Sequence, residues 1–182
     1  MNYFMRDYLN KFSKCTVPSK PVLKYLMKDY IKEVQVIPNG IDTNIFKPSN
    51  TKIGKFLDGK LNILFVGRMD KRKGLGYLLK AYKNLKVEHP NIRLIVVGEG
   101  YSKESYENIV KDNKLDDVVF EGYVPDKDLP MYYATCDLFC APTVSDESFG
   151  LIIGEAMASG KPVVATNITG YREVYGNSKG II

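Results

Sequence analysis

The strongest constraint on the fold is a series of short, almost unbroken apolar runs. Six of them predict strands: Val34–Ile37, Leu61–Val66, Ile92–Val97, Val118–Glu121, Leu138–Ala141 and Pro162–Ala165. A strand with one face in water alternates apolar and polar residues, whereas a strand covered on both faces is apolar throughout. The pattern therefore predicts a mainly parallel sheet that is buried between layers of helices.

Helical patterns lie between these runs. In Gly74–Val87 the apolar residues recur at helical spacing and form one stripe, which is typical of a helix packed on a sheet. The predicted helices are Gly74–Val87, Ser102–Asn113, Asp126–Thr135 and Phe149–Ser159. Strands that alternate with helices form right-handed βαβ units. The sequence thus predicts an α/β fold with a Rossmann-like, doubly wound parallel sheet.

Residues 1–33 do not follow this alternation. They hold seven lysine and arginine residues against three acidic ones, and so carry most of the net charge of +5. We expect one or two basic helices here, interrupted by Pro18 and Pro21, and a main domain over 34–182 that begins with the strand at Val34. A basic, tyrosine-rich segment suits peripheral contact with an anionic membrane, and an ordinary solvated helical face is the alternative. A nucleic-acid partner is not expected.

Composition limits the class of protein. A chain of 182 residues, 45% of them hydrophobic, suits one domain with a sizeable core. Three cysteines without a secretory segment indicate a reducing compartment. We therefore expect a cytoplasmic protein, either free or in peripheral contact with the inner face of the membrane. With one histidine and a single cysteine pair, no metal site is expected. The last residues, 180–182, look like the start of a strand, so the domain is expected to be truncated there.

The first junction between a strand and a helix that could bind a ligand runs from Phe65 to Gly74. A buried strand ends at Gly67, where the lack of a side chain lets the backbone approach a ligand closely. The next helix begins at Gly74, and the N–H groups and dipole of a helix N-terminus attract anions. Arg68 and Lys73 add full positive charges. This arrangement suits a diphosphate leaving group, which gains negative charge as its bond breaks, and a basic surface turn is the alternative.

Two glutamates eight positions apart mark the second junction. Glu147 precedes a helix whose N-terminus at Phe149 and Gly150 offers further N–H groups. Glu155 lies inside that helix among apolar residues, where a carboxylate is costly unless it is hydrogen-bonded. It could accept from both hydroxyls of a vicinal diol such as ribose. Stabilisation by the helix dipole would also explain Glu147, and a buried ion pair would also explain Glu155.

Other nucleotide-binding motifs are incomplete. Gly98-Glu99-Gly100 starts a dinucleotide fingerprint, but Lys103 stands where the third glycine belongs. The run 154–162 is similar to a P-loop, but its spacing is one residue too long and it ends in proline. A Ser/His/Asp triad is not credible with one histidine. The sequence therefore argues against a hydride-transfer enzyme, an ordinary NTPase and a triad hydrolase.

In their order and spacing, these junctions resemble the C-terminal, donor-binding domain of GT-B retaining glycosyltransferases of family 4, the glycosyl transferases group 1. The resemblance extends from about Val34 to the C-terminus. The matching pieces are Ile37–Asp42, Phe46 with Pro48, Gly67-Arg68 with Lys73-Gly74, Val97–Gly100, Phe120–Val124, Glu147–Gly150, Glu155–Ala165, and Gly170 with Glu173.

The resemblance implies a role for each candidate residue. Arg68 and Lys73, beside Gly67, would clamp the donor diphosphate. Glu147 would contact hydroxyls of the transferred sugar, and Glu155 would hold the ribose. Two further groups are implied: Phe149, Gly150 and Leu151 facing the sugar or phosphates, and Gly122, Tyr123 and Val124 near the base.

The resemblance also implies a reaction. A hexose would pass from a nucleoside-diphosphate sugar, such as UDP- or GDP-hexose, to a lipid, polysaccharide or small-molecule acceptor with retention of configuration, without a cofactor or an essential metal. Acceptor binding would belong to an N-terminal domain of which residues 1–33 resemble only the last helix and hinge. We therefore expect this chain alone to be inactive. A non-catalytic nucleotide-binding or assembly module with the same fold is the alternative.

Overall fold

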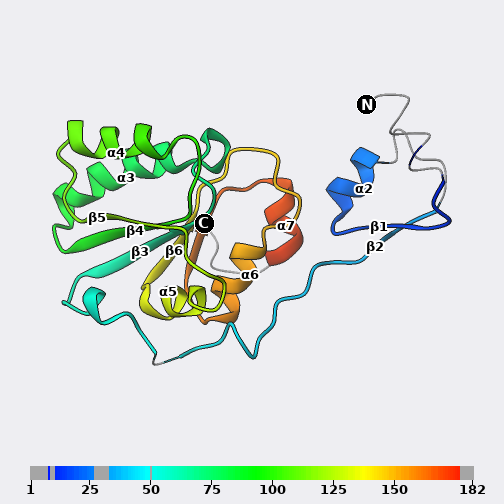
Figure 1. The fold of residues 1–182 in the computed structure, drawn as a ribbon, viewed down its shortest axis with the longest axis horizontal. Coiled ribbons are helices and arrows are strands. Elements are labelled where there is room, and N and C mark those ends of the chain that lie inside the picture. The colour runs from blue at the N-terminus through cyan, green and yellow to red at the C-terminus, as the bar shows by residue number, and fades with distance from the viewer. Residues whose placement is uncertain (1–7, 9–10, 27–32, 50, 177–182) are drawn as a thin grey trace.

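The computed structural model describes residues 8, 11–26, 33–49 and 51–176, and its centre is a five-stranded parallel sheet (Figure 1). The strands are β3 (Leu61–Val66), β4 (Ile92–Val97), β5 (Val118–Gly122), β6 (Leu138–Ala141) and β7 (Val163–Ala165), in the order β5-β4-β3-β6-β7. β3 and β4 pair along their whole length, from Leu61 opposite Ile92 to Val66 opposite Val97. The predicted α/β class and parallel sheet are confirmed.

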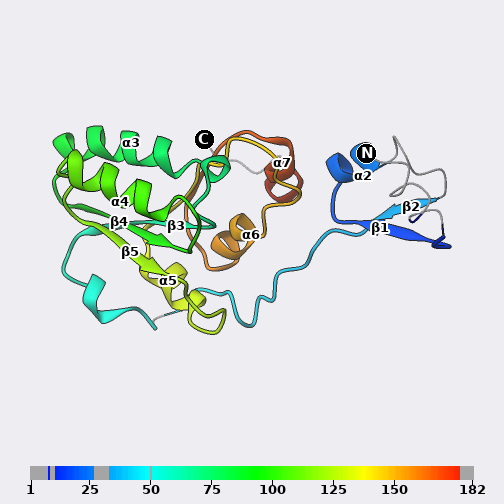
Figure 2. The same ribbon diagram turned by 45° about the horizontal axis from the view of Figure 1, so that its top comes forward.

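Helices cover both faces of this sheet (Figure 2). On one face lie α3 (Leu75–Glu88) and α4 (Lys103–Asp112); on the other lie α5 (Leu129–Thr135), α6 (Leu151–Ala158) and α7 (Thr169–Tyr175). Along β3, Ile63 and Phe65 belong to the core under α3 and α4, whereas Leu64 and Val66 belong to the core on the opposite face. Because successive strand residues point to opposite faces, a continuous apolar run is what two cores require.

The N-terminal segment differs from the prediction. It contains β1 (Cys15–Val17) and α2 (Lys20–Leu26), and β1 pairs in parallel with β2 (Val34–Val36) in a separate two-stranded sheet. The prediction that Val34 starts the main sheet was therefore wrong, because a short β-branched run indicates a strand but not its partner. Pro21 does not interrupt a helix as predicted. It lies in the first turn of α2, where its missing N–H costs nothing.

Two helices begin later than predicted. α6 starts at Leu151 rather than Phe149, because Gly150 before it takes the left-handed conformation with φ of 89°. α5 starts at Leu129 rather than Asp126. A short 3-10 helix, η2 (Lys71–Lys73), also separates β3 from α3, and a second, η1 (Gly54–Phe56), precedes β3. The chain therefore leaves β5 and β6 through longer loops than the sequence pattern indicates.

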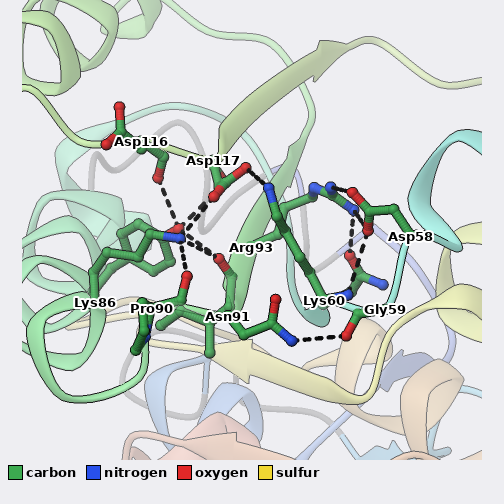
Figure 3. A network of polar contacts seen from close by, with 12 residues as sticks. Asp58, Gly59, Lys60, Lys86, Pro90, Asn91, Arg93, Asp116 and Asp117 are labelled. Atoms are coloured by element: carbon green, nitrogen blue, oxygen red, sulfur yellow. Dashed lines mark hydrogen bonds and ion pairs between the residues drawn. The ribbon is translucent and has the colours of Figure 1, made fainter.

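A network of ion pairs joins the amino ends of β3, β4 and β5, opposite the edge where the predicted site residues lie (Figure 3). Asp117, just before β5, pairs with Lys60 and with Lys86 of α3, whose Nζ lies 2.7 Å from Asp117 Oδ2. Arg93 of β4 is almost fully buried and pairs with Asp58, the Nη1 to Oδ1 distance being 3.1 Å. These contacts tie three strands and one helix together at this end of the sheet.

Candidate functional site

Among the cavities at the carboxyl edge of the sheet, where the strands end, two are lined by most of the predicted site residues. The larger, of about 490 Å³, lies over the ends of β3, β4 and β5, and we call it the β3–β5 cleft. Its lining is formed by residues 66–68, 97–100, 123–124, Asp126 and Leu129. In open parallel sheets ligands bind at this edge, so the cleft lies where the fold predicts a ligand.

The smaller cavity, of about 140 Å³, lies at the start of α6, and we call it the α6 pocket. It is lined by Asn39, Lys73 and residues 147–152. The Lys73 side chain lies between the two cavities, because it lines the α6 pocket and its Cδ lies 3.8 Å from the position that a Cβ on Gly67 would take. A ligand long enough to extend past Lys73 could therefore occupy both cavities.

An ion pair crosses the α6 pocket. Lys73 Nζ lies 2.5 Å from Glu147 Oε2, and both side chains are about 15% exposed. Lys73 comes from the loop after β3 and Glu147 from the loop after β6, two strands that are neighbours in the sheet. The sheet order therefore brings together two charged groups that are 74 positions apart in the sequence.

Asp70 organises the cationic loop after β3. Its buried carboxylate accepts a hydrogen bond from the Lys73 backbone N–H at 3.0 Å and so caps η2. The same carboxylate lies 3.6 Å from Arg68 Nη2 and 3.8 Å from Arg72 Nη2. The Arg68 side chain is otherwise 70% exposed and lines the β3–β5 cleft. Asp70 thus holds the guanidinium of Arg68 beside the cleft.

Glu155 is half-buried on α6, and its Oε2 accepts a hydrogen bond of 2.7 Å from the hydroxyl of Tyr133. Burial raises the pKa of Glu155, the bond from Tyr133 opposes that shift, and the nearby charge of Asp126 adds to it. Among the described residues no lysine or arginine nitrogen lies within 4 Å of this carboxylate, which argues against the alternative of a buried ion pair. Asp126 lines the β3–β5 cleft, whereas Glu155 itself does not.

α7 packs against the loop between β6 and α6. A Cβ on Gly170 would lie 2.0 Å from the Glu147 carbonyl oxygen, so the two backbones are in direct contact. The ring of Tyr171 packs against Gly150, and its hydroxyl lies 2.6 Å from Thr143 Oγ1. Burial raises the pKa of Tyr171, which keeps this hydroxyl neutral. α7 therefore fixes the loop that carries Glu147.

The structure places the predicted site residues along one edge of the sheet. Those lining the β3–β5 cleft are Gly67, Arg68, Tyr123 and Val124. Those lining the α6 pocket are Lys73, Glu147, Phe149, Gly150 and Leu151. Two line neither cavity: Gly122 ends β5 directly before Tyr123, and Glu155 lies one turn into α6.

Sequence reasoning missed several residues that position these groups, namely Tyr133, Asp70, Thr143 and Tyr171. Tyr133, Thr143 and Tyr171 act through contacts with segments distant in sequence, which no local pattern shows. Asp70 had a local signal, since aspartate is a preferred residue directly before a helix. Asn39 had a signal, since it belongs to the turn 37–42 of the family resemblance, but as a bare Asn-Gly turn it indicated little. In the structure it lines the α6 pocket beside Lys73 and Glu147.

Two features are absent from the part of the chain that the structure describes. No three histidine, cysteine, aspartate or glutamate side chains are grouped there so that they could hold a metal ion. In the same part of the chain, no helix combines the length and the apolar character that crossing a membrane would require.

The sequence matches known proteins over most of its length. The family model of glycosyl transferases group 1 matches residues 46–182. Phosphatidyl-myo-inositol mannosyltransferase of Mycolicibacterium smegmatis is 31% identical over 171 residues, which are 93% of this chain and 44% of that protein. Alpha-monoglucosyldiacylglycerol synthase of Streptococcus pneumoniae is 29% identical and covers 91% of this chain and 40% of its own length. The chain thus spans less than half the length of these relatives.

Solved structures agree with the sequence matches. Anabaena Alr3699/HepE, in complex with UDP and glucose, superposes with a TM-score of 0.80 and 27% identity over 93% of this chain and 49% of its own. The C-terminal domain of a glycosyl transferase group 1 family protein (LpcC) from Francisella tularensis has a TM-score of 0.65 and 29% identity, covering 74% of both chains. The five-stranded sheet and its helices are therefore the architecture of these C-terminal domains.

Proposed function

Because the chain belongs to the family of glycosyl transferases group 1, we propose that it forms the donor-binding part of a retaining hexosyltransferase. Its donor would be a nucleoside-diphosphate sugar such as UDP- or GDP-hexose. One observation carries the proposal: Arg68, Lys73 and the start of α6 lie at one edge of the sheet, beside two cavities between which the Lys73 side chain lies.

The diphosphate would lie between the two cavities. Lys73 is fixed there by Glu147, Arg68 is held by Asp70, and the first N–H groups of α6 have no acceptor within their own helix. Two cations and a helix N-terminus stabilise the negative charge that the leaving diphosphate gains as its bond to the sugar breaks. We therefore propose that Arg68 and Lys73 act on the leaving group, and that neither a cofactor nor a metal ion is needed for it.

The nucleoside would occupy the β3–β5 cleft. The base would lie against residues 122–124, whose Tyr123 is 72% exposed, and the ribose hydroxyls would donate to Glu155. The volume of about 490 Å³ is in the usual range of small-molecule sites. UDP in the HepE structure supports a uridine nucleotide, and GDP is the alternative to be tested.

In the proposed reaction the bond between the sugar C1 and the diphosphate oxygen breaks, and an acceptor oxygen bonds to C1 from the same face. The acceptor proton passes to the departing phosphate oxygen. Glu147, lining the α6 pocket next to the phosphate site, would hold hydroxyls of the transferred hexose. The relatives are more than twice as long as the matched region, so we propose that a further domain supplies the acceptor site and that this chain alone transfers no sugar.

The acceptor is proposed to be a lipid. Two relatives are named for products or substrates built on phosphatidyl-myo-inositol and diacylglycerol. A lipid acceptor would require contact with a membrane surface, for which the basic segment 1–33 is one candidate. Polysaccharide and small-molecule acceptors stay as alternatives.

A thermal-shift titration with UDP, GDP, ADP and their hexose conjugates tests the donor site. A ligand at about 100 times its dissociation constant adds about 2.7 kcal/mol to the free energy of unfolding. We expect a shift with one nucleotide family, lost in Arg68→Ala/Lys73→Ala and unchanged by EDTA. The control Lys83→Ala/Lys111→Ala removes the same charge from α3 and α4, outside both cavities.

Equal loss in the two double variants would show diffuse charge attraction instead of a built site. If no nucleotide shifted the unfolding temperature of the wild-type chain, the non-catalytic module would be favoured. A shift that disappears with EDTA and returns with magnesium would overturn the proposed independence from metal.

A further inference from the structure

A second cavity system lies outside the proposed donor site, between α3 and α4. These helices run side by side on one face of the sheet (Figures 1 and 2). The groove between them has a volume of about 630 Å³, larger than the β3–β5 cleft. It stays open because small residues, Gly76 on α3 and Ser105 on α4, line it. We call it the α3–α4 groove.

The groove is cationic and has no acidic lining. Lys71, Arg72 and Lys80 line it, and no aspartate or glutamate does. Arg72 is engaged, since its Nη1 donates to the Asp146 carbonyl at 2.7 Å. Lys71 and Lys80 are exposed, and within the described residues no carboxylate lies within 4 Å of either ammonium group. Their charges are therefore available to an anion.

The remaining lining is largely apolar. Tyr106 forms a buried wall, Ile109 lies beside it, and Tyr77 and Val144 are 66% and 46% exposed. Large exposed apolar side chains beside lysines are typical of surfaces that meet the headgroup region of a membrane. A soluble acidic peptide or free phosphate would use the lysines but would leave these side chains in water.

The groove also adjoins the proposed reaction site. Lys71 and Arg72 belong to η2, which ends at Lys73, and Val144 belongs to the loop that carries Glu147. The Val144 N–H donates to the Arg72 carbonyl at 2.9 Å, so the two segments are directly bonded. Whatever occupies the groove therefore contacts neighbours of both members of the Lys73–Glu147 ion pair.

We propose that the α3–α4 groove docks an anionic phospholipid at a bilayer surface. The phosphate would lie between Lys71 and Lys80, and the glycerol and upper acyl carbons would pack on Tyr77 and Ile109. This docking would place the carboxyl edge of the sheet close to the membrane. It uses no residue of the proposed donor site and does not depend on nucleotide binding.

Co-sedimentation of the full chain with vesicles tests this proposal. We expect binding to phosphatidylcholine vesicles that contain about 30% phosphatidylglycerol, and little binding to phosphatidylcholine alone. Lys80→Ala should weaken binding about fivefold, as expected for one basic residue near an anionic surface. Tyr77→Ala should weaken it without changing the charge. Unfolding temperatures close to the wild-type value would show that both variants fold.

Lys83→Ala is the matched control, since it removes the same charge from the same helix outside the groove lining. Equal weakening of vesicle binding by Lys80→Ala and Lys83→Ala would overturn the proposal that the groove is the docking site. Unchanged vesicle binding of Lys80→Ala would also overturn it, because binding would then belong to another segment. Complete displacement of the chain by millimolar inorganic phosphate would indicate a free-phosphate site instead. No nucleotide is present, so failure here is distinct from failure of the donor proposal.

Discussion

At the scale of single residues, Glu155 is a carboxylate whose burial costs free energy, and such a group is a candidate for binding a ligand. Its carboxylate lies in an apolar helix, where Tyr133 is its one hydrogen-bond donor among the residues that the structure describes, and burial raises its pKa. A carboxylate that is only partly satisfied keeps capacity for further donors, which ribose hydroxyls would supply. The sequence identified Glu155 because a charge inside an apolar pattern is conspicuous. It could not identify Tyr133, which looks like any aromatic residue on a packed helix.

Glu155→Ala is the residue-scale prediction. Hydrogen bonds to a charged group contribute about 1.5–3 kcal/mol, so nucleotide affinity should fall about tenfold or more. Because the folded state raises the pKa of this carboxyl, its charged form disfavours folding near neutral pH, and the variant should not lose stability through the charge. Isothermal calorimetry and thermal unfolding measure the two effects. Unchanged affinity would remove Glu155 from the ribose site.

At the scale of elements, five strands of the main sheet could be predicted because each is a short run rich in apolar residues. Burial is complete in β4, whereas β5 and β7 are partly exposed. The partner of β2 could not be predicted, since pairing with β1 depends on a segment that reads as a basic helix. The start of α6 was misplaced because the left-handed turn at Gly150 interrupts an apolar pattern that runs on from Phe149. The support of the Glu147 loop by α7 was also invisible, because it consists of contacts between elements.

The contact of α7 with that loop gives the element-scale prediction. Gly170→Ala places a methyl group 2.0 Å from the Glu147 carbonyl oxygen, so α7 or the loop has to move. We expect a destabilisation of about 1–3 kcal/mol, as for other overpacked sites, together with weaker donor binding. Gly54→Ala is the control, because no atom lies within 4 Å of its added methyl group. Chemical denaturation measures the unfolding free energy of each variant, and nucleotide titration measures its donor affinity. Wild-type stability and affinity for Gly170→Ala would contradict the supporting role of α7.

At the scale of the whole molecule, the two edges of the sheet carry different chemistry. The amino edge holds the ion-pair network of Asp58, Lys60, Lys86, Arg93 and Asp117, whereas the carboxyl edge holds glycines, loops and the candidate site (Figure 3). The candidate site is thereby separated from the contacts that fasten the strands. The sequence indicates the carboxyl edge through its glycines but not the network, whose members are scattered over 60 positions.

The network predicts how stability depends on pH. The hydrogen bond from Arg93 lowers the pKa of Asp58 from 3.8 to about 2, and the bonds from Lys60 and Lys86 lower the pKa of Asp117. A carboxyl whose pKa is lower in the folded state stabilises it above its unfolded pKa, and this stability is lost as the pH falls through the folded pKa. We expect unfolding free energy to fall between about pH 4 and 2 more steeply in the wild type than in Asp58→Asn or Asp117→Asn. Parallel curves in denaturant titrations would contradict this.

In this structure the carboxylate of Glu147 pairs with Lys73, at the position proposed for the donor phosphate. On the proposed function, a donor phosphate that binds Lys73 would compete with this carboxylate, and the displaced carboxylate would need new donors in a confined space. A nucleoside diphosphate would supply none at that position, whereas an intact nucleotide sugar would supply hydroxyls. We therefore expect the exchange to favour loading of the unreacted donor over retention of the spent nucleotide.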